Sequence, residues 1–353
     1  MFRRPTRLCR HHPWSAEAVQ VSVIGAGVAG LACALELAER GVQVEVLERA
    51  THPGAGCSSF AGGMLAPWCE QENSGPLIAR LGEESLAWWR ARFPATIVNG
   101  TLLVAHGRDA AELTQFARRT TRFEWLSAES IAALEPDLGG RFARGLHFRD
   151  EAHLDPRAAL AALAARLREL GAELRFGVEA SAGMPRGRHI IDCTGLAARA
   201  RLAGLRGVKG EMLVLRLADL SLARPVRLLH PRFPVYVVPR GEGLFMVGAT
   251  MIESDDGERV SVRSMLELLS SAYALHPAFG EAQIVEIGTG VRAAFPDNLP
   301  RLRREGETLY VNGLYRHGFL LAPALARRAA QVLLAGAHFP EVMDEDPRQR
   351  RLA

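Results

Sequence analysis

Three glycines and a glutamate near the start of the chain have the residue types and spacing of a dinucleotide-binding site. Gly25, Gly27 and Gly30 form a G-x-G-x-x-G motif, and Glu48 follows roughly 20 residues later, where such sites carry an acid. The first glycine permits a tight turn, the second lets the backbone approach a pyrophosphate, and the third lets a helix pack closely on a strand. A carboxylate at position 48 can accept the ribose hydroxyls, which disfavours NADP but leaves NAD and FAD open.

The elements expected around this motif would position it for that role. Residues 19–24 predict a β-branched strand, residues 31–40 a helix, and residues 42–47 a second strand. The free N–H groups and partial positive charge of the helix N-terminus would then face the phosphates. The alternative is a glycine-rich turn between strand and helix that binds no ligand.

The segment after the second strand bears on the choice between NAD and FAD. Residues 51–64 read THPGAGCSSFAGGM, which is small, polar and rich in glycine. Such a backbone suits a loop that wraps a bulky planar cofactor, whereas a nicotinamide enzyme would more often continue with another βαβ repeat. FAD is therefore favoured, and a flexible surface loop is the alternative interpretation.

Strands and helices alternate along the rest of the chain, which predicts an α/β fold. The strongest helix covers residues 157–170, with Asp155 as its N-cap and Pro156 at its first position. Another helix is expected to begin at Pro323, and Trp88 and Trp89 are expected to serve domain packing. Further helices are expected over residues 77–93, 109–120 and 261–276, and strands over residues 98–105, 145–148, 172–178, 190–195, 210–217, 234–239, 244–249, 284–290 and 309–312.

Composition excludes several functional classes. A chain of 353 residues suggests about two domains. With 48% hydrophobic and 23% charged residues it is an ordinary globular sequence, not a fibrous or disordered one. Its 43 basic residues nearly balance 39 acidic ones, and no basic run with interleaved aromatics occurs, so nucleic acid is not expected as a partner.

Cysteine usage and hydropathy suggest where the protein works. The five cysteines include no C-x-x-C pair, which argues against a disulfide framework or a metal site and favours a reducing, cytoplasmic compartment. No run approaches the ~18 apolar residues of a membrane span. Residues 1–18 contain four arginines but no apolar core of a signal peptide, so they are expected to be a disordered extension.

Nine sequence blocks extend the glycine motif into a family pattern. The chain resembles the D-amino-acid oxidase superfamily of FAD enzymes and, within it, the glycine oxidases of bacterial thiamine biosynthesis. The GGMLAP, GVR and HGFLLAP stretches are more specific than the glycine motif. The matching blocks, which span residues 19–335, are VIGAGVAGLACALELAERG, SSFAGGMLAPWCE, EAHLDPRAALAALAARL, IDCTG, VKGE, YVVPR, LFMVGAT, GVRAAFPDNLP and GLYRHGFLLAP.

This resemblance implies both a fold and a reaction. The fold is a Rossmann-like FAD-binding domain of discontinuous segments (19–80, 145–205 and 285–353) with an inserted α+β substrate domain (81–144 and 206–284). The reaction is oxidation of glycine or another small amine by noncovalent FAD, with O2 as acceptor and the imine, or glyoxylate with ammonia, and hydrogen peroxide as products. Thiazole synthase would consume the imine, and the enzyme is expected to be a homo-oligomer.

The resemblance also assigns roles to individual residues. Arg292 matches the arginine that binds the substrate carboxylate, and Tyr236 matches an active-site tyrosine. His317 stands where many relatives carry asparagine, and Ala293-Ala294-Phe295 replaces a more polar turn, so both departures bear on the substrate. The expected catalytic residues are Arg292, Tyr236, Arg316 and His317, and the expected cofactor contacts are Gly25, Gly27, Gly30, Glu48, Ser58, Ser59, Gly62, Gly63, Met64, Val178, Thr194, Gly195, Arg316, Gly318, Phe319 and Leu320.

The chemistry implied asks for positioning more than for acid–base groups. Flavin carries the difficult step, while a guanidinium fork matches the two oxygens of a carboxylate. The N-terminus of the final helix would stabilise the anionic edge of a reduced flavin. Two weaker hypotheses are that Cys57 bonds covalently to the flavin and that Lys209, the only lysine, activates oxygen rather than opening a strand.

Two other functions stay open at this point. One is an FAD-dependent dehydrogenase of another small amine or a 2-hydroxy acid that passes electrons to an acceptor other than oxygen. The other is a flavin-binding subunit without turnover of its own. Formation of peroxide on addition of glycine separates the oxidase from both.

Overall fold

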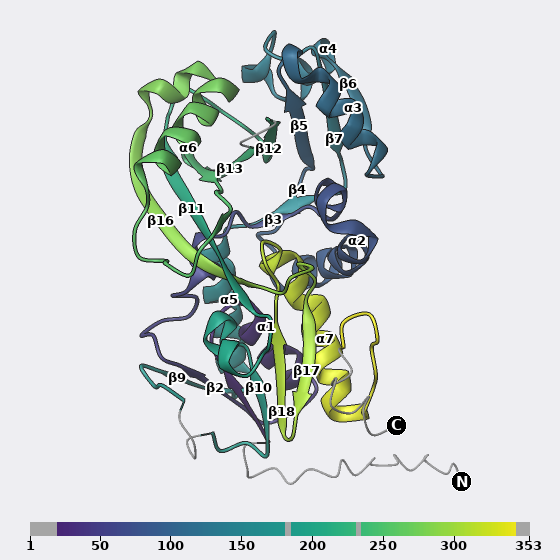
Figure 1. Ribbon diagram of the computed structural model, residues 1–353, viewed down its shortest axis with the longest axis vertical. Coiled ribbons are helices and arrows are strands. Elements are labelled where there is room, and N and C mark those ends of the chain that lie inside the picture. The colour runs from purple at the N-terminus through teal and green to yellow at the C-terminus, as the bar shows by residue number, and fades with distance from the viewer. Residues whose placement is uncertain (1–19, 181–184, 231–233, 344–353) are drawn as a thin grey trace, which may run out of the picture.

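Two β-sheets of different type form the two ends of the molecule (Figure 1). This computed structural model describes residues 20–180, 185–230 and 234–343, so the extension expected over residues 1–18 lies outside the described part. One sheet is mostly parallel and has six strands, and the other is mostly antiparallel and has nine. The expected α/β class is confirmed.

The six-stranded sheet contains the glycine motif. Its core strands are short, apolar and buried on both faces, as parallel strands covered by helices are. Val23 of the central strand lies in register with Val46 on one side and Ile191 on the other. The sheet order is β17-β18-β10-β1-β2-β9, formed by Arg301–Glu305, Thr308–Asn312, His189–Asp192, Val21–Ile24, Val44–Glu48 and Glu173–Phe176.

Three helices pack around this sheet at the lower end of Figure 1: α1 (Val28–Ala38), α5 (Pro156–Glu169) and α7 (Gly318–Ala335). The start of α5 follows the prediction, since the carboxylate of Asp155 accepts a bond of 2.7 Å from the N–H of Ala158. Helix α7 is long and apolar enough to cross a membrane by composition, but two thirds of it is buried inside the protein, as in a core helix.

The expected start of the last helix at Pro323 is wrong, because α7 already begins at Gly318. Proline inside a helix leaves the carbonyl four residues earlier without its usual N–H partner. Here that carbonyl belongs to Phe319, and the indole Nε1 of Trp89 donates to it at 2.8 Å. A side chain from another helix therefore satisfies the carbonyl, and the helix continues through the proline.

Helix α2 (Pro67–Arg92) links the two ends of the molecule. It begins ten residues before the expected start at 77, and Gly75 interrupts it with φ 76° ahead of Pro76. Trp88 and Trp89 are both buried, and the indole of Trp88 donates to Glu36 of α1 at 2.5 Å. The two tryptophans thus serve packing, as expected.

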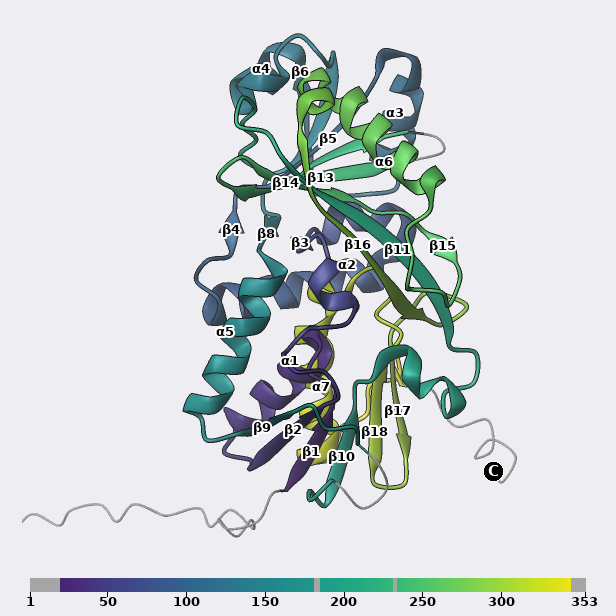
Figure 2. The same cartoon turned by 90° about the vertical axis from the view of Figure 1, so that its left-hand side faces the viewer.

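The nine-stranded sheet forms the upper end of the molecule, with α3 (Ala110–Arg118), α4 (Ala128–Leu134) and α6 (Val262–Leu275) packed around it. Its two longest strands, β11 and β16, run side by side from this end down toward the six-stranded sheet (Figure 2). The sheet order is β15-β11-β14-β13-β12-β5-β7-β6 with β16 on the free side of β11, formed by Ile252–Glu253, Arg206–Arg216, Leu244–Gly248, Val235–Gly241, Val226–Leu229, Thr101–Ala105, Arg144–Phe148, Glu124–Ser127 and Gln283–Ala294.

Membership of the two sheets differs in detail from the expected segment boundaries. The boundary placed at residue 145 would assign β7 to the cofactor domain, but β7 pairs with β5 in the nine-stranded sheet. The boundary at 285 falls inside β16, at a register shift where residue 285 has no partner in β11, and β16 pairs with β11 on both sides of that point. Strand pairing therefore places β7 and all of β16 in the nine-stranded sheet, and the division into two domains stays a prediction. A third, three-stranded sheet joins β3 (Met64–Leu65), β8 (Ala152–His153) and β4 (Ile97–Val98) between the two ends.

Candidate active site

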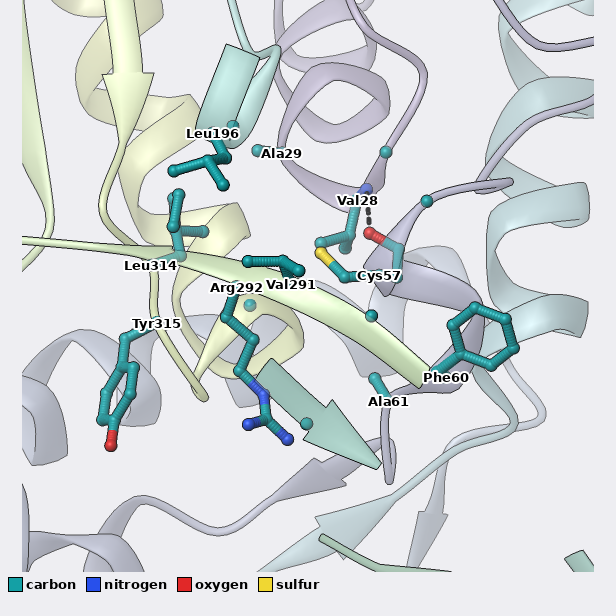
Figure 3. A pocket seen from close by; sticks show the side chains of 18 of the residues that line it. Val28, Ala29, Cys57, Phe60, Ala61, Leu196, Val291, Arg292, Leu314 and Tyr315 are labelled. Atoms are coloured by element: carbon teal, nitrogen blue, oxygen red, sulfur yellow. Dashed lines mark hydrogen bonds between the residues drawn. The ribbon is translucent and has the colours of Figure 1, made fainter. Parts of the chain in front are cut away.

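A cavity of about 860 Å³ lies between the two large sheets (Figure 3). Its volume is in the upper part of the roughly 300–1,000 Å³ typical of ligand pockets. Its lining comes from the ends of β1, β2 and β10 on one side and from β11, β13 and β16 on the other. It includes the expected residues Gly25, Gly27, Glu48, Ser58, Gly62, Gly63, Met64, Val178, Thr194, Gly195, Tyr236, Arg292, Arg316, His317, Gly318, Phe319 and Leu320.

Glycine is required at different positions of the motif for different structural reasons. Gly25 has φ +98°, and a Cβ there would lie 2.9 Å from the carbonyl oxygen of Cys193. A Cβ on Gly30 would lie 1.8 Å from the carbonyl oxygen of Gly25, so this residue serves the contact between helix and strand. Gly30 is not part of the cavity lining, whereas Gly25 and Gly27 are.

Glu48 ends strand β2 and its carboxylate is oriented by the backbone. One oxygen accepts a bond of 2.7 Å from the N–H of Ala26, and the other accepts a bond of 2.9 Å from the N–H of Ala50. The carbonyl of Glu48 accepts from the N–H of Val178 at 2.9 Å, which places residue 178 beside it at the cavity wall. A carboxylate held in this way lies at the edge of the sheet where a ribose would bind.

The two expected serine contacts are placed differently. Residues 57–60 form a 3₁₀ turn, η1, in which successive side chains point in different directions. Ser58 lines the cavity, and its hydroxyl accepts from the N–H of Val28 at 3.2 Å. Ser59 turns away and donates to the carbonyl of Gly54, so it lines a smaller neighbouring hollow instead. A direct cofactor contact by the Ser59 side chain is therefore not supported.

Arg292 extends from β16 into the cavity (Figure 3). Its Nη1 donates to the carbonyl of Thr250 at 3.1 Å. A Cβ on Gly210 of β11 would fall within 2.1–2.4 Å of the guanidinium, so only glycine leaves it room there. Among the described residues no carboxylate lies within ion-pair distance of Arg292. A half-buried guanidinium without an acidic partner is suited to a carboxylate from a ligand.

Tyr236 lies on β13 at the same end of the cavity. Its ring is so close to Gly62 that a Cβ there would come within 2.7 Å of Cε2. Burial raises the pKa of its hydroxyl, while the charges of Arg292 and Arg316 act in the opposite direction. The hydroxyl is therefore protonated at neutral pH and can donate a hydrogen bond into the cavity.

Arg316 and His317 belong to a buried charge cluster that the sequence did not indicate. Glu70, in the first turn of α2, contacts Nη2 of Arg316 at 3.0 and 2.8 Å. Nη1 of Arg227 lies 3.6 Å from the same carboxylate and donates to the carbonyl of Cys69 at 2.9 Å. Both Glu70 and Arg227 also line the cavity. The sequence signal that could have identified these two residues is a charged residue beside or inside an apolar stretch. Glu70 ends the stretch PWCE, and Arg227 lies in the stretch VRLL.

The electrostatics of this cluster fix its protonation states. Burial alone would raise the pKa of Glu70, but Arg316, Arg227 and His317 together hold it at about 2. Burial lowers the pKa of His317 to about 4, and its Nε2 lies 2.8 Å from the hydroxyl of Ser74. At neutral pH the histidine is uncharged, and one carboxylate faces two guanidinium groups. This end of the cavity consequently carries net positive charge.

The first turn of α7 closes the cavity beneath these residues. Gly318, Phe319 and Leu320 line it, so the expected contacts are the first residues of the helix rather than a loop before it. The N-terminal N–H groups of a helix attract negative charge. Phe319 also stacks on Trp89 with 5.7 Å between ring centroids, which anchors this turn in the core.

The surroundings of three other residues bear on the roles considered for them from the sequence. Cys57 lines the cavity as a free thiol. Lys209 pairs with Glu211 at 3.3 Å and does not line the cavity, which argues against a role in oxygen activation. Phe295 is buried against Leu202 and its neighbours behind β16, so the departure from the family pattern at this position does not shape the cavity.

The residues present fit an FAD molecule. The glycine turn, the oriented carboxylate and two helix N-termini lie along one continuous cavity, and Gly25 and Gly27 allow a ligand to approach the backbone. In the described part of the chain, no three histidine, cysteine or acidic side chains are grouped to hold a metal ion. The sequence profile of the FAD dependent oxidoreductases known as the DAO family matches residues 20–332. The chain belongs to this FAD-dependent family.

Comparison with individual proteins agrees with the family assignment. A candidate thiamine biosynthesis oxidoreductase, ThiO, of Rhizobium etli is 57% identical over 92% of this chain and 99% of its own length. A bifunctional ThiO/ThiG protein of Nostoc is 29% identical over 89% of this chain and 52% of its own length. The crystal structure of glycine oxidase from Geobacillus kaustophilus superposes with a TM-score of 0.77 at 25% identity and covers 93% of this chain and 97% of its own. The protein is therefore an FAD-dependent oxidoreductase.

Proposed function

We propose that this enzyme oxidises glycine, or a similarly small amine, with noncovalent FAD and molecular oxygen. The observation that carries the proposal is the guanidinium of Arg292, which projects without an acidic partner into the cavity that begins at the glycine motif. The names of the Rhizobium, Nostoc and Geobacillus relatives support the same choice. Glycine, oxygen and water would give glyoxylate, ammonia and hydrogen peroxide.

The side chains at the Arg292 end would bind and orient the substrate. Arg292 pairs with the carboxylate, and the protonated hydroxyl of Tyr236 donates to it. FAD, when bound, supplies the acceptor for the hydride of the α-carbon and returns the electrons to oxygen. The N-terminus of α7 and the net positive charge around Arg316 offset negative charge that develops at this end of the cavity.

Among the residues that the structure describes, none that lines the cavity beside Arg292 is a free base for the substrate amine. Glu70 is the acid at this end of the lining, and its pKa of about 2 and its contact with Arg316 leave it ionised and occupied. His317 is neutral but hydrogen-bonded to Ser74. The amine must then arrive already neutral, and we expect kcat/KM to rise with pH until the amine itself is deprotonated.

The reaction would belong to the synthesis of the thiazole of thiamine. The fused ThiO/ThiG relative supports this, because one chain there joins the two named proteins. A thiazole synthase would then consume the imine before water hydrolyses it. Cytoplasmic location and a homo-oligomeric state are part of the same proposal, and light scattering of the purified protein tests the second.

A substrate panel tests the proposed function directly. The purified holoenzyme should be yellow and release its flavin on acid treatment without proteolysis. Peroxide should form with glycine and sarcosine but not with L-leucine, with D-alanine and D-proline as intermediate cases. Anaerobic bleaching of the flavin by a substrate, without peroxide in air, would instead identify a dehydrogenase. Neither bleaching nor peroxide with any compound would favour the subunit without turnover, and a flavin that resists acid release would point to a bond from Cys57.

A further inference from the structure

The only lysine of the chain lies beside a buried carboxylate on β11, one strand away from Arg292. Glu211 is fully buried, and its Oε1 lies 3.3 Å from the ammonium of Lys209. Burial alone would raise the pKa of Glu211, but hydrogen bonds from Ser264, Ser261 and Thr250 and the contact with Lys209 hold it below its usual value. The site is therefore a charged pair inside the protein, which costs desolvation unless its partners are well placed.

This pair holds the segment of residues 249–261 against the sheet. Glu211 accepts from the N–H of Ser261 at 3.2 Å and from the hydroxyl of Thr250 at 3.0 Å, so one carboxylate contacts both ends of the segment. Lys209 donates to the carbonyl of Arg259 near the same end. The secondary structure of the segment itself is slight, because β15 has two residues and two pairings with β11. The middle of the segment is also attached through Asp255, which accepts from the N–H of Gly207 at 3.1 Å, whereas the Lys209–Glu211 pair is the buried attachment that contacts both of its ends.

The attached segment forms part of the cavity at its Arg292 end. Met251 and Gly257 belong to the lining. The carbonyl of Thr250 accepts from Nη1 of Arg292 at 3.1 Å, and the N–H of Glu211 donates to the hydroxyl of the same Thr250 at 2.9 Å. A short chain of hydrogen bonds therefore leads from the carboxylate of Glu211 through Thr250 to the guanidinium of Arg292.

We propose that Lys209 and Glu211 are positioning residues that hold residues 249–261 closed on β11 and so orient Arg292 for carboxylate binding. The identity of the carboxylate as part of a substrate rests on the proposed function. The attachment of residues 249–261 to β11 does not depend on the proposed function. A guanidinium has many rotamers, and fixing one of them before the ligand arrives lowers the entropy lost on binding. The effect should appear in the affinity for a carboxylate more than in the rate at saturation.

The test compares Glu211→Ala, Glu211→Gln and Lys209→Met in the holoenzyme. Loss of one supporting hydrogen bond is expected to weaken acetate binding, followed by the flavin absorbance, by about 5- to 30-fold. Glutamine can still accept from Ser261, so Glu211→Gln should retain part of the affinity that Glu211→Ala loses. For glycine, KM should rise by a similar factor while kcat changes little, as expected when binding is lost equally from substrate and transition state.

Limited proteolysis gives a measurement that does not depend on activity. Arg259 is exposed, and trypsin cleaves after arginine in segments that open locally. Cleavage after Arg259, followed by mass spectrometry, should be several times faster in all three variants. If the wild-type protein neither oxidises an amine nor binds acetate, the proposed function fails, and this cleavage still tests the attachment of the segment.

Glu135→Ala is the matched control. Glu135 is also a buried carboxylate of the upper end, where it accepts from the N–H of Ala223 at 3.0 Å and from Arg224 at 2.6 Å, but it does not line the cavity. The control should lower Tm while it leaves acetate binding and cleavage after Arg259 unchanged. Unchanged acetate affinity in Glu211→Ala and Lys209→Met would overturn the positioning role. Unchanged cleavage in both would overturn the attachment itself.

Discussion

Many glycine and alanine residues line the cavity at its glycine-motif end, whereas a cluster of charged side chains lines it at its Arg292 end. At the first end, Gly25 and Gly27 follow a strand directly and open a helix, so residues adjacent in sequence also lie together in space. At the second end, Glu70, Arg227, Arg292 and Arg316 come from four separated segments. The contrast shows that a local motif can specify one end of a cavity, while the charges at the other end depend on contacts between distant segments.

Replacement of Arg292 should give the largest effect, because it should impair turnover at one end of the cavity and leave FAD binding at the other end unchanged. We expect Arg292→Ala to lower kcat/KM for glycine by about a hundred- to a thousandfold, because loss of a buried charged partner costs about 3–5 kcal/mol. Bound FAD, measured by absorbance, should stay near one per chain. Arg141→Ala is the control, since Arg141 also donates to backbone carbonyls but lies outside the cavity lining. Equal kinetics in wild type and Arg292→Ala would contradict the proposal that Arg292 binds the substrate carboxylate.

Phe295 tests whether a residue next to the strand of Arg292 affects the substrate without lining the cavity. It directly follows β16 but is not part of the lining. We expect Phe295→Ala to lower the free energy of unfolding by about 3–5 kcal/mol, the usual cost of removing a buried phenylalanine. The ranking of glycine, sarcosine and D-proline in kcat/KM should not change. Urea unfolding and the substrate panel measure the two effects. A variant that gains activity on larger amines would show that the ring does limit the substrate.

Two buried carboxylates near the start of α2 should respond to pH in opposite directions. Glu70 has its pKa lowered to about 2, so the stability it contributes is present above about pH 4.5 and is lost as the pH falls toward 2. Glu151 accepts from the N–H groups of Trp68 and Cys69, yet burial raises its pKa to about 8. The stability from its protonated form is present below about pH 4.5 and is lost as the pH rises toward 8.

Glu151→Gln tests this difference, because glutamine resembles the protonated carboxyl. Between pH 6 and 8 Glu151 is ionised in the unfolded chain but still largely protonated in the folded protein. The free energy of unfolding of the wild type should therefore fall by up to about 1.4 kcal/mol per pH unit. The variant should lack this contribution, so its unfolding curve should depend less on pH in that interval. Parallel pH profiles for wild type and variant would mean that Glu151 is ionised in the folded protein at neutral pH.

The smallest effect is expected for His317→Asn. Since the pKa of His317 lies at about 4, the residue carries no charge above pH 6, and asparagine is the residue expected there in many relatives. Loss of its hydrogen bond to Ser74 should change kcat/KM by no more than about tenfold. The shape of the pH profile above pH 6 should stay the same. A shifted profile would assign proton transfer to this histidine.

Local patterns were sufficient wherever neighbouring residues determine the structure. The strand before Gly25, the acid at the end of β2 and the Asp155 cap of α5 all lie where the sequence predicted them. Each depends on residues within one or two turns or strands of one another. The family resemblance then added Arg292 and Tyr236, which no local pattern distinguishes from other arginines and tyrosines.

Tertiary contacts decided the rest. The sequence alone determined an α/β protein with a dinucleotide motif, because glycine spacing and hydrophobic alternation are local properties. Only the folded chain brings Trp89 to the carbonyl that Pro323 leaves free, turns Ser59 away from the cavity and places Phe295 behind β16. It also surrounds Glu70 with Arg227 from β12 and Arg316 from the turn before α7, and so fixes an ionised carboxylate inside the protein. Burial and charge depend on which distant segments meet, and that information is not contained in the spacing of residues along the chain.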